Sequence, residues 1–166
     1  MRSIIVSLIA IFSLSVAVAQ SSLARPYAVG ADISWLQWQE QSGVEFSDGG
    51  IKGDALTILR DNGFNYIRLR LFVNPRSELG YSQRDGFCDL EHTLAMAKRI
   101  KEAGMYFLLD FHYSDNWADP QKQIMPQAWQ TFSYEEVCTE VYNHTKTTLE
   151  ALVAQGTAPD MVQVGN

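Results

Sequence analysis

Four stretches of the sequence have the hydrophobic pattern of buried β-strands. They cover residues 27–34 (YAVGADIS), 65–72 (NYIRLRLF), 105–113 (MYFLLDFHY) and 160–166 (DMVQVGN). The third stretch is apolar almost to its end, which is typical of a parallel strand that is covered on both faces. The pattern therefore predicts the strands of a parallel sheet.

Helical patterns separate these strands, with apolar residues at intervals of three and four. The three stripes are Ile51, Ala55, Ile58 and Leu59; Leu90, Leu94, Ala97 and Ile100; and Val137, Val141, Thr145, Thr148 and Leu152. Asp89 is well placed to cap the second helix. Gly63, Gly104 and Gly156 follow the three stripes, and glycine readily adopts the left-handed conformation that ends a helix.

The alternation of strands and helices predicts right-handed crossovers and a parallel α/β sheet. Long connections follow the strands, at residues 35–50, 73–88 and 114–133, and they hold all four tryptophans. Barrels and open α/β sheets both place their functional sites at this end of the strands. Four such units form either half of a (β/α)8 barrel or an open four-stranded sheet, and the pattern alone leaves both open.

The first 20 residues have the pattern of a secretory signal peptide. Arg2 precedes an apolar run over residues 4–16, and Ala17-Val18-Ala19 supplies the small residues of a cleavage site. The apolar run is shorter than the roughly 20 residues that a membrane span needs. We expect residues 1–19 to be removed, leaving residues 20–166 as one domain of a secreted chain, extracellular or periplasmic, with no membrane association after cleavage.

Charge and cysteine content narrow the classes of partner. The net charge is −6 and no basic run is present, which argues against nucleic acid and anionic membranes as partners. A neutral polymer remains compatible with this charge. Cys88 and Cys138 lie 50 residues apart. Export permits a disulfide, so a disulfide and free thiols both remain open.

The stretch LLDFHYSDNWADP holds the strongest concentration of chemistry-bearing residues. The period of two along a strand places Asp110 and His112 on one side, and Trp117 and Asp119 follow in the loop. Buried charged groups need partners, so the stretch indicates a sugar-binding site or a structural ion network. A metal site is the third reading, but no further His or Cys cluster completes a ligand set, and no metal or cofactor is expected.

Arg68 and Arg70 share one face of the second strand and require carboxylate partners if they are buried. Asp32 and Asp110, near the ends of the neighbouring strands, are the candidates. An arginine in such a place can keep a carboxylate ionised and oriented. Asn166 at the end of the fourth strand could donate to a substrate hydroxyl, although an Asn after Gly also commonly forms a turn.

Six segments of the chain are similar to stretches of a single enzyme family. They are GADIS, EQSGVEFSD, NGFNYIRLRLFVNP, AKRIKEAGM, LLDFHYSDNWADPQKQIMPQAW and DMVQVGN, which run from about Gly30 to Asn166. Together they resemble glycoside hydrolase family 53, the arabinogalactan endo-β-1,4-galactanases. The resemblance implies the N-terminal half of a (β/α)8 TIM barrel, with about four βα units. It also implies a retaining mechanism that uses two Glu residues about 5–5.5 Å apart.

The resemblance also implies where the catalytic residues lie. In this family the fourth strand typically ends in Gly-Asn-Glu, and the Glu is the acid/base. Gly165 and Asn166 are the last two residues of the sequence. The acid/base Glu is therefore expected immediately after Asn166 and the nucleophile further downstream. We expect an N-terminal part of a catalytic domain, truncated after the fourth strand, with no catalytic residue and no activity alone.

Pattern and resemblance together give a set of expected substrate-binding or supporting residues. They are Asp32, Arg68, Asp110, His112, Trp117, Asp119 and Asn166. The resemblance implies that Arg68 lies close to the nucleophile and that Asn166 contacts the 2-hydroxyl of the sugar being cleaved. Two positions depart from the family: Phe72 stands where Trp is frequent, and Asn116 where Thr is common.

The function implied by the resemblance is internal cleavage of β-1,4-galactan in type I arabinogalactan, a component of pectic side chains. The expected partner is this polysaccharide. One alternative is another β-glycanase of the same clan, acting on mannan or glucan. A second alternative is a non-catalytic carbohydrate-binding protein, if the chain is complete.

Overall fold

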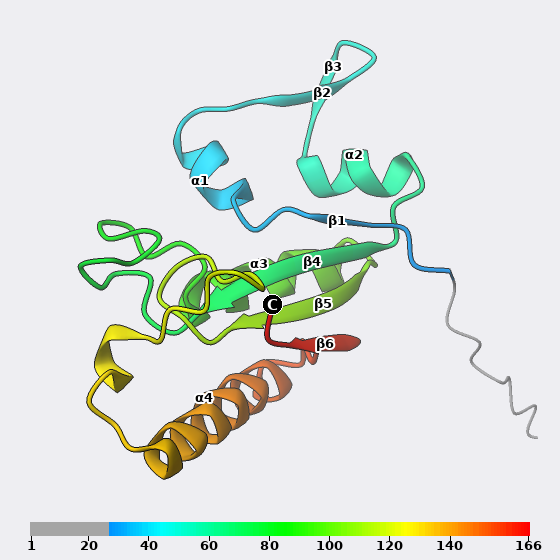
Figure 1. Cartoon of the computed structure of the whole chain (residues 1–166). Helices are drawn as coiled ribbons and strands as arrows, with labels where there is room; N and C mark the ends of the chain where they lie inside the picture. Colours follow the sequence, from blue (N-terminus) through cyan, green and yellow to red (C-terminus); the bar gives the residue numbers. More distant parts are fainter. Residues whose placement is uncertain (1–26) are drawn as a thin grey trace, which may run out of the picture.

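The computed structural model describes residues 27–166, so the predicted signal peptide lies outside the described residues. Its centre is a four-stranded parallel sheet in the order β1-β4-β5-β6 (Figure 1). The strands are β1 (Gly30–Asp32), β4 (Tyr66–Phe72), β5 (Tyr106–His112) and β6 (Met161–Val164). Among residues 27–166, no helix has the length and hydrophobicity required to cross a bilayer.

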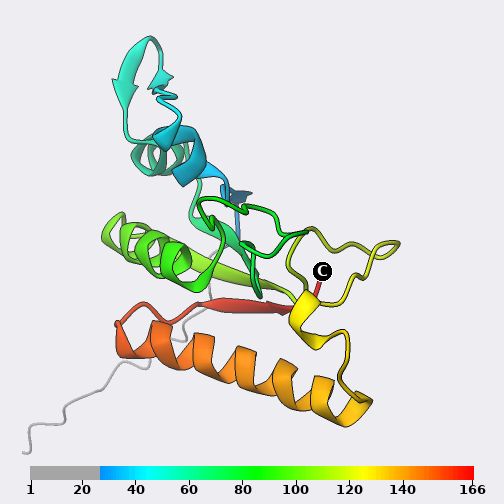
Figure 2. The ribbon, with the colours of Figure 1, turned by 90° about the vertical axis from the view of Figure 1, so that its left-hand side faces the viewer.

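Three helices connect the strands of this sheet. They are α2 (Ala55–Asp61), α3 (Leu90–Glu102) and α4 (Tyr134–Ala154). The order of these elements along the chain confirms the predicted alternation of strands and helices, and Figure 2 shows α4 running below β6. The predicted cap of α3 is confirmed as well, since the Asp89 carboxylate accepts the His92 amide at 2.8 Å.

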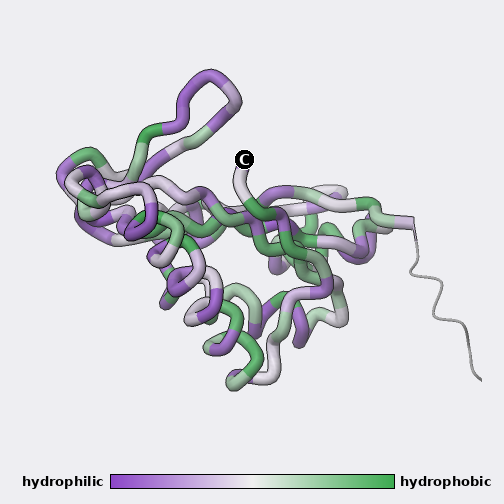
Figure 3. The backbone as a smooth tube through the Cα atoms, turned by 60° about the horizontal axis from the view of Figure 1, so that its bottom comes forward, coloured by the Kyte–Doolittle hydropathy of each residue, from purple (hydrophilic) through white to green (hydrophobic). Residues whose placement is uncertain are grey.

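The hydrophobic core lies between the sheet and these helices. Its strand residues are Ile67, Leu69 and Leu71 of β4 and Phe107, Leu109 and Phe111 of β5, each at most 3% exposed. The helical coils in Figure 3 carry both hydrophobic and hydrophilic residues, and the apolar residues Leu56, Ala97 and Leu152 of the three helices belong to the core. Because strand side chains alternate, Arg68 and Asp110 necessarily lie on the opposite face.

Parallel register places the polar residues of this opposite face side by side. It pairs Asp32 with Arg68, Arg70 with Asp110, Phe72 with His112, and Asp110 with Gln163. The carboxyl ends of four strands therefore bring together groups that are far apart in the sequence.

The segment 46–53 forms a β-hairpin, so the prediction that Ile51 belongs to a helical stripe is wrong. Strands β2 (Phe46–Asp48) and β3 (Ile51–Gly53) pair in antiparallel fashion. The turn residues Gly49 and Gly50 both have positive φ, at 54° and 82°. A two-residue turn with this geometry strongly favours a hairpin, and it outweighs the chance periodicity of Ile51.

The first predicted strand is also too long at both ends. The chain turns immediately after β1, where the Ile33 carbonyl accepts the Leu36 amide at 2.8 Å. Within the segment predicted as a loop, a short helix follows, α1 (Leu36–Gln41). The last predicted strand likewise ends early, because Gly165 adopts a positive φ of 89°. A 3-10 turn, η1 (Gln127–Trp129), lies in the third long connection.

The two cysteines do not form a disulfide. Cys88 is buried and donates its thiol to the Ser34 carbonyl at 3.3 Å, whereas Cys138 is exposed on α4. Burial raises the pKa of the Cys88 thiol to about 12. Cys88 therefore remains a protonated thiol at neutral pH, and the question left open by the sequence is answered in favour of free cysteines.

We expect a thiol reagent at pH 8 to modify one cysteine of the native protein. Only the thiolate reacts readily, and Cys88 is both buried and protonated. The Cys138→Ser variant should show no rapid reaction until urea unfolds it. Rapid labelling of the native Cys138→Ser protein, measured by release of the chromogenic leaving group, would contradict the burial of Cys88.

His144 of α4 lies in an aromatic cluster at the end of β5. Its ring centroid is 5.8 Å from that of Phe111, 6.3 Å from Tyr113 and 6.4 Å from Trp129. The buried Nε2 has no hydrogen-bond partner among the described residues. Burial lowers the pKa of the ring below its ordinary value.

This burial makes part of the stability dependent on pH. The pKa of histidine in an unfolded chain is about 6.5. At pH values below about 6.5 the unfolded chain therefore binds a proton at His144, whereas the buried ring of the folded protein stays neutral until the pH falls further. The contribution of the neutral His144 ring to the free energy of unfolding is therefore fully present above about pH 6.5. It is lost as the pH falls toward the lowered pKa of the folded state. We expect the drop in unfolding free energy between pH 7 and pH 5 to be smaller in His144→Gln, measured by urea denaturation. An identical drop in both proteins would refute the role of His144.

Candidate functional site

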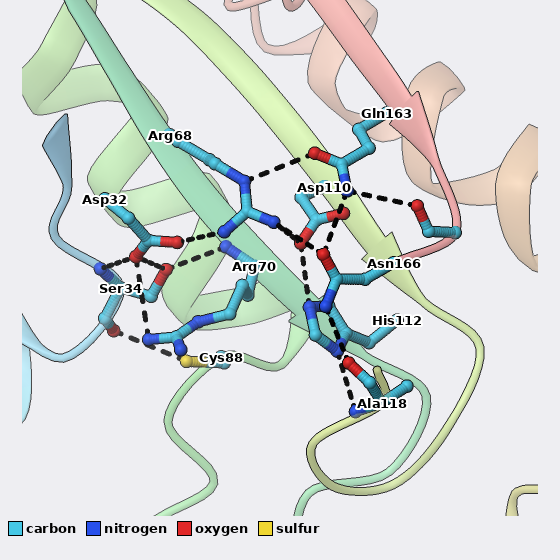
Figure 4. A network of polar contacts seen from close by, with 11 residues as sticks. Asp32, Ser34, Arg68, Arg70, Cys88, Asp110, His112, Ala118, Gln163 and Asn166 are labelled. Carbon is cyan, nitrogen blue, oxygen red and sulfur yellow. Dashed lines mark hydrogen bonds and ion pairs between the residues drawn. The ribbon is translucent and has the colours of Figure 1, made fainter. Parts of the chain in front are cut away.

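Arg68 lies at the centre of a polar network at the carboxyl ends of the strands (Figure 4). Its guanidinium contacts the Asp32 carboxylate and lies 2.5 Å from Asp110 Oδ2. Nη2 also donates to Asn166 Oδ1 at 3.2 Å. The predicted pairing of Arg68 with Asp32 and Asp110 is therefore confirmed. The four groups come from β1, β4, β5 and the end of β6, so the network depends on the whole sheet.

Ser34 fixes the position of the Asp32 carboxylate. Its hydroxyl donates to Asp32 Oδ1 at 2.6 Å, and its backbone amide donates to the same oxygen at 3.0 Å. The hydroxyl also accepts the Arg70 amide at 2.8 Å. Ser34 is not among the site residues predicted from the sequence. Ser34 lies two residues after Asp32, which could have indicated a contact between the two side chains. That contact, however, depends on the tight turn after β1, which the sequence pattern did not predict.

Asp110 and His112 are completely buried. His112 Nδ1 accepts the amide of Ala118 at 3.2 Å, so the proton of the neutral ring is on Nε2. Nε2 lies 2.7 Å from Asp110 Oδ2, in an electrostatic contact that is not aligned as a hydrogen bond. His112 thus connects the carboxylate at the strand end to the loop that carries Trp117.

The formal charges of this network cancel. Two aspartates, Asp32 and Asp110, face two arginines, Arg68 and Arg70, with Arg70 Nη2 3.5 Å from Asp32 Oδ1. Buried ion pairs are expensive to desolvate and contribute more to orientation than to stability. The site therefore offers fixed hydrogen-bonding groups with no net charge, which suits an uncharged polar ligand.

Arg70 is stacked between two tryptophans. Its Cζ lies 3.8 Å from the ring centroid of Trp117 and 5.0 Å from that of Trp35. The guanidinium is buried, while Trp117 is 41% and Trp35 38% exposed. Cation–π contact holds the rings in place and leaves aromatic surface open to a ligand. Trp117 was predicted, but Trp35 was missed because position in a long loop did not distinguish it from the other tryptophans.

Asn166 is tied to both the network and the loop after β5. Its Nδ2 donates to the Ala118 carbonyl at 2.6 Å, and its Oδ1 accepts from Gln163 Nε2 at 3.0 Å. A side-chain amide has two N–H donors, so one of them is free for a ligand. Gln163 was missed by the sequence analysis, since its place beside Asp110 depends on the register of β6.

Asp119 is the one expected residue that the structure does not bring into the network. Its side chain is exposed and accepts the Gln121 amide at 2.8 Å, within a turn closed by backbone bonds to Lys122. Its role in binding stays a prediction.

Asp115 is buried and joins two of the long connections. Its Oδ1 accepts the amide of Asn74 at 3.0 Å, and its Oδ2 accepts the amide of Gln127 at 2.9 Å. Asp115 is not among the site residues predicted from the sequence. The structure shows that it sets the course of the segments around Trp117.

Within residues 27–166, no group of three or more His, Cys, Asp or Glu side chains is arranged to hold a metal ion. The groups that the site does offer are amide, guanidinium and carboxylate groups beside aromatic faces, which can orient an uncharged polar ligand.

A parallel α/β sheet with polar and aromatic residues gathered at the carboxyl ends of its strands is the arrangement found at the active end of α/β barrels. The sequence profile of glycosyl hydrolase family 53 matches residues 28–166, and the chain belongs to this family. The probable arabinogalactan endo-β-1,4-galactanase A of Aspergillus terreus is 44% identical over 138 residues, which are 82% of this chain and 37% of that protein. The endo-β-1,4-galactanase of Bacillus subtilis is 38% identical over 143 residues, 86% and 33% of the two chains.

The structural comparison leads to the same family. The family 53 catalytic domain of Ignisphaera aggregans superposes with a TM-score of 0.75 and 42% identity, over 82% of this chain and 38% of that one. The predicted fold class is confirmed, as the described residues form four parallel strands and the three helical connections between them, which match part of such a barrel. The chain spans 33–38% of the length of these three relatives.

Proposed function

We propose that the described residues form the sugar-binding part of the active site of an endo-acting, retaining β-1,4-galactanase. Membership of glycosyl hydrolase family 53 and the names of two relatives support this proposal. The single observation that carries it is the charge-balanced network around Arg68, which is flanked by the exposed faces of Trp35 and Trp117.

Galactan cleavage with retention requires two carboxyl groups about 5–5.5 Å apart, one as acid/base and one as nucleophile. The carboxylates of the network, Asp32 and Asp110, are both paired with Arg68. We therefore propose that Asp32 and Asp110 position the other groups of the site, and that the two catalytic glutamates come from sequence beyond Asn166. In this arrangement Asn166 would offer its free N–H to a hydroxyl of the bound sugar, and Arg68 would orient the carboxylates around it.

Affinity electrophoresis tests the substrate class on the chain itself. We expect a gel containing β-1,4-galactan to retard the protein, and gels containing mannan or β-glucan to leave it unretarded. Trp117→Ala should remove the retardation, whereas Tyr142→Ala, which removes an exposed aromatic ring of α4, should not. Retardation by mannan or glucan alone would replace galactan with the substrate of another β-glycanase.

Hydrolysis is tested with the complete product of the reading frame that contains this sequence. An endo-acting enzyme lowers the viscosity of galactan faster than it releases reducing ends. Release of single galactose units would contradict the endo mode. Binding without any product would favour a non-catalytic carbohydrate-binding protein.

We also propose that the protein is exported and acts on the galactan of pectic material outside the cell. This proposal rests on the signal-peptide pattern at residues 1–19. Sequencing the N-terminus of protein recovered from the medium or the periplasm should give a chain that begins at Gln20. A mature chain that retains Met1 would overturn it.

A further inference from the structure

A hollow of about 470 Å³ lies beside the Arg68 network, between α1 and the segment 81–87. Trp38, Tyr81, Arg84, Asp85 and Phe87 are among its lining residues. Its volume falls within the range of about 300–1,000 Å³ that is usual for small-molecule sites. In Figure 1 the segment that follows β4 lies below α1, at the same end of the sheet as the network.

We propose that this hollow, defined by Trp38 and Tyr81, binds a further, uncharged sugar residue of the galactan chain. The inference rests on the proposed function and adds a binding position that the network residues do not provide. A galactan chain bound at the Arg68 network would then also be bound at a second position, away from the bond that is cleaved.

Aromatic side chains connect the network to the hollow. The ring of Tyr81 meets that of Trp117 edge-on, with centroids 6.1 Å apart and planes at 81°. Trp35 lies beside Arg70 and begins the turn that contains Trp38. Trp38 follows Trp35 by three residues, so α1 leads from the side of Arg70 to the wall of the hollow. Trp38 is 53% exposed and has aromatic surface available.

The wall of the hollow is preformed. The Tyr81 amide donates to the Asp115 carbonyl at 2.9 Å, and the Gly86 amide donates to the Ser82 carbonyl at 2.8 Å. Arg76 Nη1 donates to the Arg84 carbonyl at 3.1 Å. Gly86 has a φ of 79°, a backbone conformation that residues with a side chain rarely adopt. A loop that is already held in place by hydrogen bonds loses little conformational entropy when a ligand binds.

The charges of the hollow indicate an uncharged ligand. Arg84 and Asp85 form an ion pair in which Nη2 lies 3.0 Å from Oδ2, so their charges cancel. Burial raises the pKa of the Tyr81 phenol, which therefore keeps its proton and can donate to a hydroxyl. Aromatic faces beside paired charges and a phenol match the alternating apolar and hydroxyl surfaces of a sugar.

Titration with β-1,4-galacto-oligosaccharides of two to six units tests the proposal on the full chain. We expect the affinity of the wild-type protein, measured by calorimetry, to increase with oligosaccharide length. Trp38→Ala should weaken binding of the longest ligand about tenfold, as for an aromatic anchor, and leave binding of the disaccharide unchanged. Trp38→Phe should retain part of the gain, and Tyr142→Ala should match the wild type at every length.

The outcomes separate this inference from the proposed function. Galactan binding with no effect of Trp38→Ala at any length, or with an equal loss at every length, overturns the hollow and leaves the function standing. A Trp38-dependent gain with manno- or gluco-oligosaccharides alone overturns galactan as the substrate and supports the hollow as a sugar site. Absence of binding to every oligosaccharide overturns both. Thermal melting of each variant verifies that it is folded.

Discussion

Replacing Asp110 by alanine should destabilise the protein by about 3 kcal/mol, the lower end of the cost of breaking a buried ion pair. The carboxylate is completely buried, lies 2.5 Å from the Arg68 guanidinium and contacts the His112 ring. Its removal leaves the partly buried Arg68 guanidinium, whose side chain is 26% exposed, with one partner fewer. The loss is at the lower end because Arg68 keeps its contact with Asp32. Urea denaturation of wild type and variant measures the difference.

Two further variants define what the Asp110 experiment reports. Asp110→Asn keeps the shape and removes the charge, so it should lie between the wild type and Asp110→Ala. Glu150→Ala breaks an exposed ion pair, in which the Glu150 side chain is 63% and the Lys146 side chain 51% exposed. This variant should lower the free energy of unfolding by only about 0.3–0.5 kcal/mol. If Asp110→Ala costs no more than this control, Asp110 does not hold the network together.

The sequence was sufficient to predict the central part of this network. Period two along β4 and β5 separates the charged residues from the core, and parallel strands end at the same edge of the sheet. Arg68 and its partners Asp32 and Asp110 follow from these two rules. The interactions of Ser34 and Gln163 do not, because one depends on a tight turn and the other on the register of an edge strand.

The errors in the fold have a common physical origin. One segment can fit the pattern of a helix and that of a hairpin, and the backbone angles of a few residues decide which of the two forms. The apolar spacing of Ile51 matched a helix, yet Gly49 and Gly50 at positive φ formed a hairpin. The state of Cys88 and Cys138 could not be read from their spacing, because it depends on which faces of the fold carry them.

Asp115→Ala is expected to have an effect of similar size on stability and a second effect on binding. The change leaves the amides of Asn74 and Gln127, whose hydrogen bonds to Asp115 are partly buried, without an acceptor. Leaving a buried donor unsatisfied costs about 1–3 kcal/mol, and the lower end applies to these partly buried amides, so the pair should cost about 2 kcal/mol in total. The two connections would also separate, which displaces Tyr81 and Trp117 and weakens retardation by galactan.

Hydrogen exchange distinguishes this tie between loops from a general loss of stability. In Asp115→Ala the amides of Asn74 and Gln127 should exchange faster than in the wild type, relative to the amides of β5. Asp115→Asn retains one acceptor oxygen but sets an NH2 group against the other amide, so one of the two should remain protected. Asp119→Ala, in which an exposed carboxylate loses the Gln121 amide, should change the unfolding free energy by about 0.5 kcal/mol or less. Unchanged exchange at Asn74 and Gln127 in Asp115→Ala would mean that other contacts position Trp117 and Tyr81.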